Sequence, residues 1–428
     1  MSHRVAERAI ATLSAVATGQ GELQRTLGLS DAVIIGAGSM IGAGVFAAWS
    51  PAAEAAGTGA LVGLAIAAVV AFCNAASSAQ LAAIHPESGG TYVYGRRQLS
   101  EFWGHVAGWG FVVGKTASCS AMALTVGAYL WPDQARWVAV AAVVGITAVN
   151  IGGLSRTVAV TRVLLVVSIT ALVVVVVSGW SSDGADLDRI TPIDGDLFDI
   201  LQSAGLMFFA FAGYARIATL GEEVREPERT IPRAVPLALG AVLVVYAVVG
   251  VTAFAVAPAE ALADTGAPLR VVVELGGLDS LAPIVRIGAG IASLGVLLNL
   301  IPGISRVTLA MARNRELPGW FAHIDGARSL PLRAELTVAV VVIVLISVLD
   351  LRNAIGLSGV AVLTYYAITN AASLTLTAEQ RRWPFPVAVV GLIGCLVLIV
   401  TLPPAAVVSG VAVLIVGVVA RQLALRVR

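Results

Sequence analysis

The chain has 428 residues, of which 58% are hydrophobic and 12% are charged, and its mean hydropathy is +0.90. Soluble globular domains carry about 25% charged residues, so this composition excludes a soluble globule. The formal net charge is +1 and the basic residues are dispersed over short segments, so the sequence offers no basic surface for nucleic acid.

Hydrophobic residues come in blocks of about 20, the length at which a helix crosses a hydrocarbon core of about 30 Å. Strands of a membrane barrel would alternate apolar and polar residues, and runs such as 163–177 do not. We therefore predict an all-α integral membrane protein with about twelve transmembrane helices in a lipid bilayer. The predicted helices cover residues 31–50, 58–83, 103–130, 135–153, 159–179, 198–221, 234–257, 282–312, 335–349, 354–377, 385–401 and 404–421.

The first 28 residues are polar and lack an apolar core followed by a small-residue cleavage site, which predicts a cytoplasmic tail rather than a cleaved signal peptide. Most arginines fall on the side of this tail, whereas the opposite loops are acidic, with Asp186 and Asp188 among their residues. Cytoplasmic loops carry the excess of Lys and Arg. Both termini are therefore predicted to be cytoplasmic, with the chain crossing the plasma (inner) membrane several times.

Glycines interrupt the first predicted helix, where Gly36, Gly38, Gly42 and Gly44 fall in the run IGAGSMIGAGVF. The sixth predicted helix has a similar interruption in FFAFAGYAR, which begins at Phe208. Interruptions at matching positions in two halves indicate an inverted-repeat transporter with a binding site between them. Close helix packing is the alternative, because small residues four apart also let two membrane helices approach.

Unwound backbone inside a membrane leaves N–H and C=O groups without partners, and it persists where it lines a cavity or meets a ligand. The N-terminus of a half-helix suits a carboxylate because its N–H groups and its dipole are positive. Carbonyl groups at the end of the preceding half-helix suit an ammonium group. A site that contains both the N-terminus of one half-helix and the carbonyl groups of the other suits a zwitterion.

Four segments resemble the amino acid–polyamine–organocation (APC) superfamily of permeases. They are GSMIGAGVF in the first helix, ESGGTYVYGRR before the third, FFAFAGYARIATLGEEVREPERTIPRA in and after the sixth, and SRVTLAMARNRELP at the end of the eighth. The last segment departs from the family at residues 314–316, where an acidic residue and a glycine are usual. The resemblance extends over nearly the whole chain and is most specific in the sixth-helix segment.

The resemblance implies a five-plus-five inverted repeat with broken helices 1 and 6, followed by two more helices. Residues 1–28 would form the cytoplasmic N-terminal tail and residues 29–180 the first five-helix repeat. Residues 181–378 would form the second repeat, and residues 379–428 the last two helices with a short cytoplasmic C-terminus.

The resemblance also implies a set of substrate-binding residues at the two breaks. Backbone N–H groups of Gly42, Ala43 and Gly44 would bind the carboxylate of the substrate. The amino group would be bound by carbonyl groups of the sixth-helix break, which includes Gly213, and of the first-helix break. These carbonyl groups belong to Met40, Phe209 and Ala212, and Phe209 stands where the family often has an aromatic gate.

Lys115 is the only lysine in the chain and lies in the middle of the third predicted helix. A charge at that depth costs about 2.5–3.5 kcal/mol by insertion scales, so an ionisable residue there suggests a function. Some members of the family place a coupling lysine in the fifth helix, but residues 166–171 of this chain contain none. We consider two roles for Lys115: a residue that couples protons or orders the pocket, and a structural plug on carbonyl groups at a helix break.

Arg216 follows the sixth-helix break and is the second candidate for coupling or gating. Two fixed cations near a pocket repel a cationic cargo and favour a neutral or an acidic amino acid. The alternative is that Arg216 pairs with Glu222, Glu223 or Asp31 as part of an inner gate.

The sequence therefore predicts a secondary active transporter that moves an amino acid, preferably a neutral one, by alternating access with a proton gradient. Sodium coupling through Ser168, Thr170 or Ser293 is less favoured, because hydroxyl groups in membrane helices commonly bond their own backbone. No metal site or cofactor is expected, since the three cysteines stand in separate apolar blocks.

The sequence also leaves alternatives to this prediction. Within the same superfamily, the chain could be an amino acid/polyamine exchanger, and outside carriers it could be a channel or a receptor without transport. A membrane enzyme is not expected, because the four histidines are scattered and no phosphate loop or nucleophile motif occurs.

Overall fold

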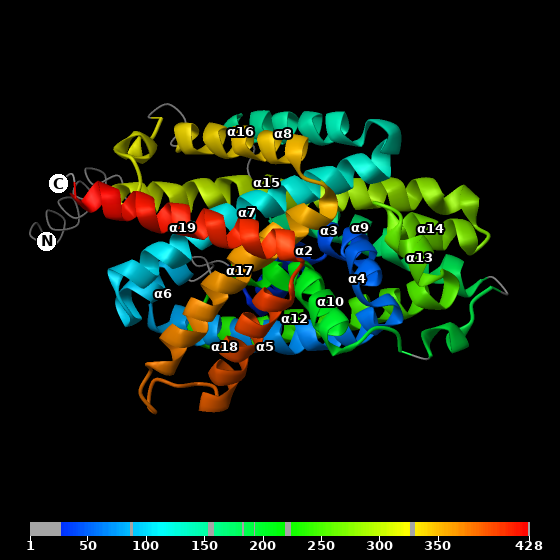
Figure 1. Ribbon diagram of the computed structural model, residues 1–428, viewed down its shortest axis with the longest axis horizontal. Helices are drawn as coiled ribbons and strands as arrows, with labels where there is room; N and C mark the ends of the chain where they lie inside the picture. The colour runs from blue at the N-terminus through cyan, green and yellow to red at the C-terminus, as the bar shows by residue number, and fades with distance from the viewer. Residues whose placement is uncertain are drawn as a thin grey trace, which may run out of the picture.

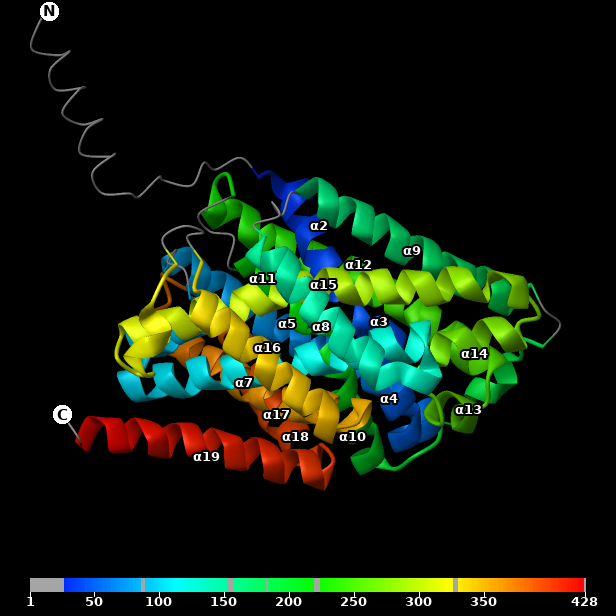
Figure 2. The ribbon, with the colours of Figure 1, turned by 90° about the horizontal axis from the view of Figure 1, so that it is seen from above.

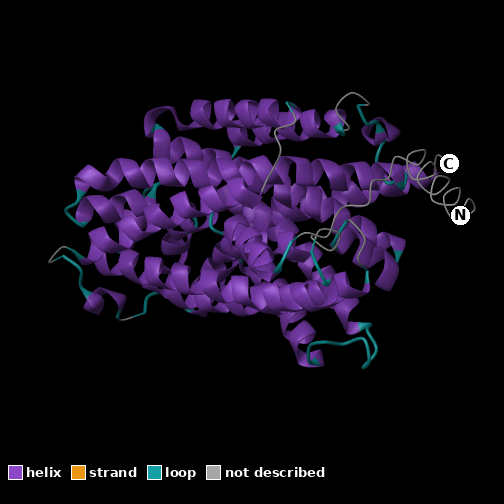
Figure 3. Cartoon of the chain, turned by 180° about the vertical axis from the view of Figure 1, so that it is seen from behind, coloured by secondary structure: helices purple, strands orange, loops and turns teal. Residues whose placement is uncertain are grey.

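The computed structural model describes residues 27–85, 89–152, 158–181, 184–191, 193–218, 224–325 and 330–426. In these ranges the regular elements are helices, apart from two isolated bridge pairs between single residues (Figure 3). Most of the predicted N-terminal tail lies outside the described residues. Glu222 and Glu223, predicted as pairing partners of Arg216, lie outside them too.

The helices of the first half correspond to the first five predicted segments, with one additional short helix, α6. They are α2 (Leu29–Met40), α3 (Ala43–Ala47), α4 (Trp49–Ala56), α5 (Ala60–Ile84), α6 (Thr91–Gln98), α7 (Glu101–Leu130), α8 (Ala135–Ile151) and α9 (Val158–Trp180).

The second half contains the remaining seven predicted segments, together with two short helices, α13 and α14, that the hydropathy pattern did not predict. Its elements are α10 (Leu197–Phe211), the 3-10 turn η4 (Ala212–Tyr214), α11 (Ala215–Ala218), α12 (Pro227–Val256), α13 (Ala259–Ala263), α14 (Pro268–Leu275), α15 (Ala282–Arg313), α16 (Leu332–Val348), α17 (Leu351–Leu374), α18 (Phe385–Thr401) and α19 (Pro404–Arg426).

Side-chain caps fix where two of the central helices begin. The Asp196 carboxylate accepts the Asp199 N–H at 3.0 Å before α10, and the Asp350 carboxylate accepts the Asn353 N–H at 2.7 Å before α17. Each cap satisfies one of the N–H groups that the first turn of a helix leaves unbonded.

Helices α7 and α17 form the centre of the bundle. They are the most buried of the long helices, and α7 packs along both α17 and α15 (Figure 1). Helices α9 and α19 are the least buried, together with α8, and lie on opposite edges of the molecule (Figure 2). The centre of the bundle is therefore where side chains of α7 can reach the interrupted helices.

Ten helical spans among the described residues are long and apolar enough to cross a membrane. Helices α16 and α18 have 17 residues each. The outer helices expose large apolar side chains, including Val163 and Val166 of α9 and Ile415 and Val416 of α19. Exposed apolar surface of this extent is typical of a face in contact with lipid.

Candidate functional site

The first predicted helix is interrupted where the glycine pattern indicated. Helix α2 ends at Met40, the chain bends at Ile41 and Gly42, and α3 starts at Ala43. Ala43 and Gly44 form the first turn of α3 after this bend, and the N–H groups of a first turn have no acceptor within their own helix. The Gly42 N–H is used locally, since it donates to the Met40 carbonyl oxygen at 2.9 Å.

The sixth predicted helix is also interrupted. Helix α10 ends at Phe211, and the chain passes through η4 before the four residues of α11. The N–H of Ala212 donates to the carbonyl oxygen of Phe209 at this end of α10. The run FFAFAGYAR therefore changes from α-helix to a 3-10 turn and back, whereas the sequence predicted unwound backbone there.

The two breaks lie directly against each other, and glycines allow this approach. A Cβ atom on Gly44 would lie 2.5 Å from the Cα atom of Ala210, and one on Gly213 would overlap the carbonyl oxygen of Ser39. A Cβ atom on Gly42 would overlap the side chain of Val296 in α15. These glycines thus serve close packing as well as the interruption of the helices.

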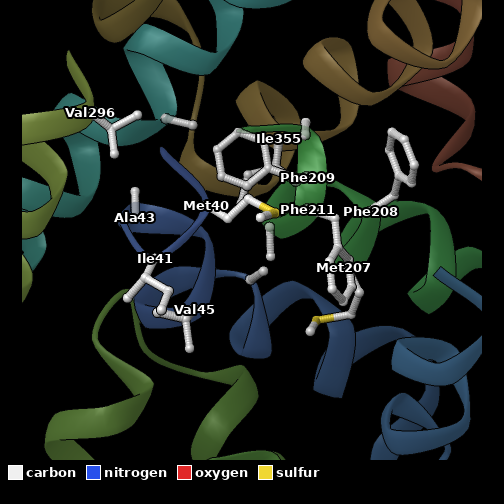
Figure 4. Close-up of a cluster of buried hydrophobic side chains, with 14 of the residues drawn as sticks. Met40, Ile41, Ala43, Val45, Met207, Phe208, Phe209, Phe211, Val296 and Ile355 are labelled. Atoms are coloured by element: carbon white, nitrogen blue, oxygen red, sulfur yellow. The ribbon is translucent and has the colours of Figure 1, made fainter. Parts of the chain in front are cut away.

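An apolar cluster surrounds the place where the breaks meet. Met40, Ile41 and Ala43 from the first break lie close to Phe209 from α10 and Val296 from α15 (Figure 4). Phe209, the predicted aromatic gate, is 6% exposed and is packed into this cluster. Because this cluster is of low polarity, it strengthens any electrostatic interaction that the backbone groups of the breaks make.

Two buried tyrosines that the sequence analysis missed bind carbonyl groups at or near the breaks. The Tyr246 hydroxyl of α12 lies 2.7 Å from the Met40 oxygen and 3.0 Å from the Ala210 oxygen, so it joins the ends of α2 and α10. The Tyr129 hydroxyl of α7 donates to the Phe46 oxygen at 2.6 Å. Tyr246 stands among valines and alanines in the sequence, and that isolated polar group was the available signal.

Lys115 reaches the second break from α7. Its Nζ atom donates to the carbonyl oxygen of Ala212 at 3.0 Å, and the residue is 5% exposed. This contact is compatible with both roles considered for Lys115, and it brings together two predicted site residues that lie 97 positions apart. The carbonyl groups predicted to receive an amino group therefore all have a donor in this structure: Tyr246 at Met40, Ala212 N–H at Phe209 and Lys115 at Ala212.

A cavity of about 70 Å³ lies on the side of the breaks where α2 begins. Its walls come from α2, α9, α11 and α15, and its lining includes Ser39, Ile41, Ser168, Arg216 and Asn299. Arg216 therefore lies in the wall of the cavity. Asp31, a predicted partner of Arg216, forms an ion pair with Arg162 of α9 at 2.5 Å.

The opposite side of the breaks is closed by contacts between distant segments. Helix α13 packs on α4, where the Ser50 hydroxyl donates to the Ala263 oxygen at 3.0 Å. The Leu269 N–H of α14 donates to the Tyr129 hydroxyl at 3.2 Å. Arg352 at the start of α17 pairs with Glu54 of α4.

The hydroxyl groups considered for sodium bond their own helices. Ser168 donates to the Leu164 oxygen at 2.8 Å and Thr170 to the Val166 oxygen at 2.9 Å. Within the described part of the chain, no three His, Cys, Asp or Glu side chains form a group that could hold a metal ion.

A family model and several relatives each match this chain over most of its length. The model of a family described as amino acid permease matches residues 27–420. An uncharacterized transporter of Mycobacterium tuberculosis is 58% identical over 93% of this chain and 91% of its own length. The branched-chain amino acid permease BcaP of Bacillus subtilis is 24% identical over 88% of this chain and 86% of its own length. The chloroplastic cationic amino acid transporter 7 of Arabidopsis thaliana is 26% identical over 82% of this chain and 65% of its own length.

Proposed function

This chain belongs to the amino acid permease family, and from that premise we propose that it carries a neutral amino acid across the plasma membrane by alternating access. The observation that supports this most is the contact between two interrupted helices in the centre of a membrane bundle. The first turn of α3 supplies N–H groups for a carboxylate, and the end of α10 with η4 supplies carbonyl groups for an ammonium group.

The charges around the breaks favour a cargo without a net positive charge. Lys115 contacts the second break and Arg216 lines the adjoining cavity, and no ion pair of Lys115 with an acid occurs among the described residues. A cationic cargo that approaches the site would be repelled by a protonated Lys115 more strongly than a zwitterion would be. Relatives are named for branched-chain and for cationic amino acids, and of these the branched-chain class fits this site.

Alternating access requires a cavity on one side of the site and a seal on the other. The cavity lies where α2 begins, and the seal is formed by α4, α13, α14 and the start of α17. With a cytoplasmic N-terminus, this arrangement is an inward-facing state. Transport would require the seal to open and the walls of the cavity to close, by motion of one five-helix group against the other.

We include α16 and α18 among the membrane helices, which gives twelve with both termini cytoplasmic. A helix of 17 residues is about 26 Å long, close to the hydrocarbon thickness of a bilayer. The repeats would be residues 29–180 and 181–378, so that the breaks occupy equivalent positions in the two repeats.

Lys115 supports coupling to a proton gradient, because a buried amine at the site can exchange a proton. A sodium-coupled carrier is less supported, since the hydroxyl groups of Ser168 and Thr170 bond backbone carbonyl groups. An exchanger of amino acids or polyamines would use the same breaks and would differ in requiring cargo on both sides of the membrane.

A thermal-shift screen of the purified protein against the standard L-amino acids tests the choice of cargo. A ligand that binds the folded state at 100 times its Kd adds about 2.7 kcal/mol to the free energy of unfolding, which raises the melting temperature by a few degrees. We expect neutral amino acids to raise it and arginine and lysine to leave it unchanged. Stabilisation by cationic amino acids alone would contradict the proposed cargo.

A further inference from the structure

Lys115 and the amino group of a bound amino acid are chemically alike, since both are ammonium groups that seek a carbonyl oxygen. In the structure the Lys115 Nζ atom holds the Ala212 oxygen at 3.0 Å. The other two carbonyl groups of the site are held by neutral donors, the Tyr246 hydroxyl and the Ala212 N–H. Lys115 is thus the one charged donor among these three contacts.

We propose that the Lys115 ammonium occupies the position of the cargo's amino group at the α10–η4 break, so that a protonated Lys115 and a bound amino acid exclude each other. This inference rests on the proposed function. It adds the direction in which protons move relative to the cargo. A cargo ammonium placed at the Ala212 oxygen would lie within a few ångströms of a second positive charge in an apolar cluster, where repulsion is strong. Loss of the Lys115 proton to water removes the repulsion and leaves a neutral amine beside the cargo.

Among the described residues, Lys115 has no ion pair with an acid that would offset this repulsion, and Arg216 of α11, four residues after Ala212, is also a cation. Cys119 lies one turn further along α7 and is the titratable group in electrostatic contact with Lys115. Helix α17 carries Tyr365 against Phe111 of α7, and Tyr366 against Tyr214 of η4. Thiols and phenols ordinarily lose protons above pH 8 and near pH 10, so neither class changes charge between about pH 5 and 8.

Charged groups on the other helices that pack against α7 include Arg136 of α8, which donates to the Ser347 oxygen, and Arg421 of α19. Arg286 of α15 donates to the carbonyl oxygens of Tyr129 and Leu130 at the far end of α7. At the near end, Arg96 of α6 pairs with Glu316, which follows α15. His105 in the first turns of α7 lies 3.7 Å from the same carboxylate. Glu335 is in the first turn of α16 and α3 has no titratable residue.

Mutual exclusion determines the direction of coupling. One proton leaves Lys115 when one zwitterion binds, and one proton returns when the cargo leaves, so cargo and proton cross the membrane in opposite directions. By reciprocity, protonation of Lys115 must weaken cargo binding by the same factor by which the cargo weakens protonation. The carrier is then an amino acid/proton exchanger, in which an inward proton gradient drives the cargo outward.

The test is proton counting during binding of a neutral amino acid to the purified full-length protein. L-leucine is added at several pH values between 5 and 8 in weakly buffered detergent solution with a pH indicator, and the other neutral L-amino acids are used if leucine does not bind. We expect release of up to one proton per leucine bound, and a Kd that falls about tenfold for each unit of pH increase while Lys115 is protonated. Uptake of protons, or saturable binding with no change in protons, would overturn the proposal.

Two substitutions separate the proton of Lys115 from its charge. Lys115→Met removes both, so binding should become independent of pH and release no proton. Lys115→Arg keeps a charge that is not lost below pH 12, so binding should be weaker than in the wild type at pH 8, independent of pH, and without proton release. Proton release that persists in Lys115→Arg would assign the proton to another group and reject the proposal.

The chain offers a direct spectroscopic control, because Lys115 is its only lysine. Labelling with ¹⁵N-lysine gives one side-chain amine signal, which should change from ammonium to amine on addition of L-leucine near neutral pH. An ammonium signal that persists in the leucine complex would reject the inference while leaving amino acid binding intact. If no neutral amino acid binds, the proposed function fails and this inference fails with it.

Discussion

Tyr246 and Tyr129 show how single side chains stabilise an interrupted membrane helix. An unpaired carbonyl group costs free energy in a medium without water. Each tyrosine is buried and donates its hydroxyl to a backbone carbonyl oxygen at or near a break, Tyr246 to Met40 and Tyr129 to Phe46. The breaks are therefore supported from α7 and α12, which lie outside the interrupted helices themselves.

Removal of the Tyr246 hydroxyl tests this support. Tyr246→Phe keeps the ring in place and leaves the carbonyl groups of Met40 and Ala210 without that donor. We expect a loss of about 1–2 kcal/mol, because interhelical hydrogen bonds in membranes contribute up to roughly that amount. A lower melting temperature in detergent with unchanged expression would agree with this, and a wild-type melting temperature would contradict it.

Gly44 tests the close contact of the two breaks. Gly44→Ala places a methyl group 2.5 Å from the Cα atom of Ala210 and should push α3 away from α10. Amino acid uptake by proteoliposomes should fall at least tenfold, since a displacement of about 1 Å can cost a hundredfold in activity. Gly240→Ala in α12 is the matched control, because a Cβ atom there meets nothing within 4 Å.

Both glycine variants should be recovered from the membrane in wild-type amounts. Equal uptake by Gly44→Ala and Gly240→Ala would show that the contact between α3 and α10 is not needed for transport.

At the scale of the element, the sequence was informative about long helices and their interruptions. Within the described residues, each of the twelve predicted segments overlaps a helix, the first is interrupted at Ile41–Gly42, and the sixth changes to a 3-10 turn at Ala212–Tyr214. Length and hydropathy determine such helices, and local glycines determine such breaks.

The sequence was less informative about short helices and about contacts between distant residues. Helices α13 and α14 have five and eight residues and no membrane-length hydropathy signal. The partners of Lys115 and Tyr246 are separated from them by 97 and 206 positions, so no local pattern could have identified them. Asp31 was one predicted partner of Arg216, and the structure shows it in an ion pair with Arg162, 131 positions away.

The backbone conformation just after α15 gives a prediction about the stability of the protein. Arg315 has φ +60°, in the left-handed region that favours glycine. A non-glycine residue in that region costs about 1–2 kcal/mol, so Arg315→Gly should raise the melting temperature by up to a few degrees. Arg313→Gly, in the last turn of α15, is the control and should lower it. Destabilisation by both substitutions would show that the contacts of the Arg315 side chain outweigh its backbone strain.

At the scale of the whole molecule, the account requires that the seal opposite the cavity can open. Arg352 and Glu54 join α17 to α4 across this seal with partly exposed side chains. Such a pair contributes about 1 kcal/mol or less, so Arg352→Ala should raise the population of the opened state by roughly fivefold at most.

Alkylation of a cysteine placed under the seal measures that opening. The three native cysteines are buried, so Ser50→Cys provides a reporter beneath α13. We expect Arg352→Ala to accelerate its alkylation, whereas Arg136→Ala should not, although Arg136 lies on the same side of the molecule and bonds the Ser347 oxygen. Identical rates in the two variants would mean that the ion pair does not hold the seal.

Flux through the purified protein tests the central claim most directly. Reconstituted into proteoliposomes, the protein should exchange radiolabelled neutral amino acids saturably, with unlabelled neutral amino acids competing and arginine and lysine failing to compete. Amino acid movement that increases in proportion to concentration without saturation, or protein-dependent flux that is absent for every neutral amino acid, would contradict an amino acid carrier built on two broken helices.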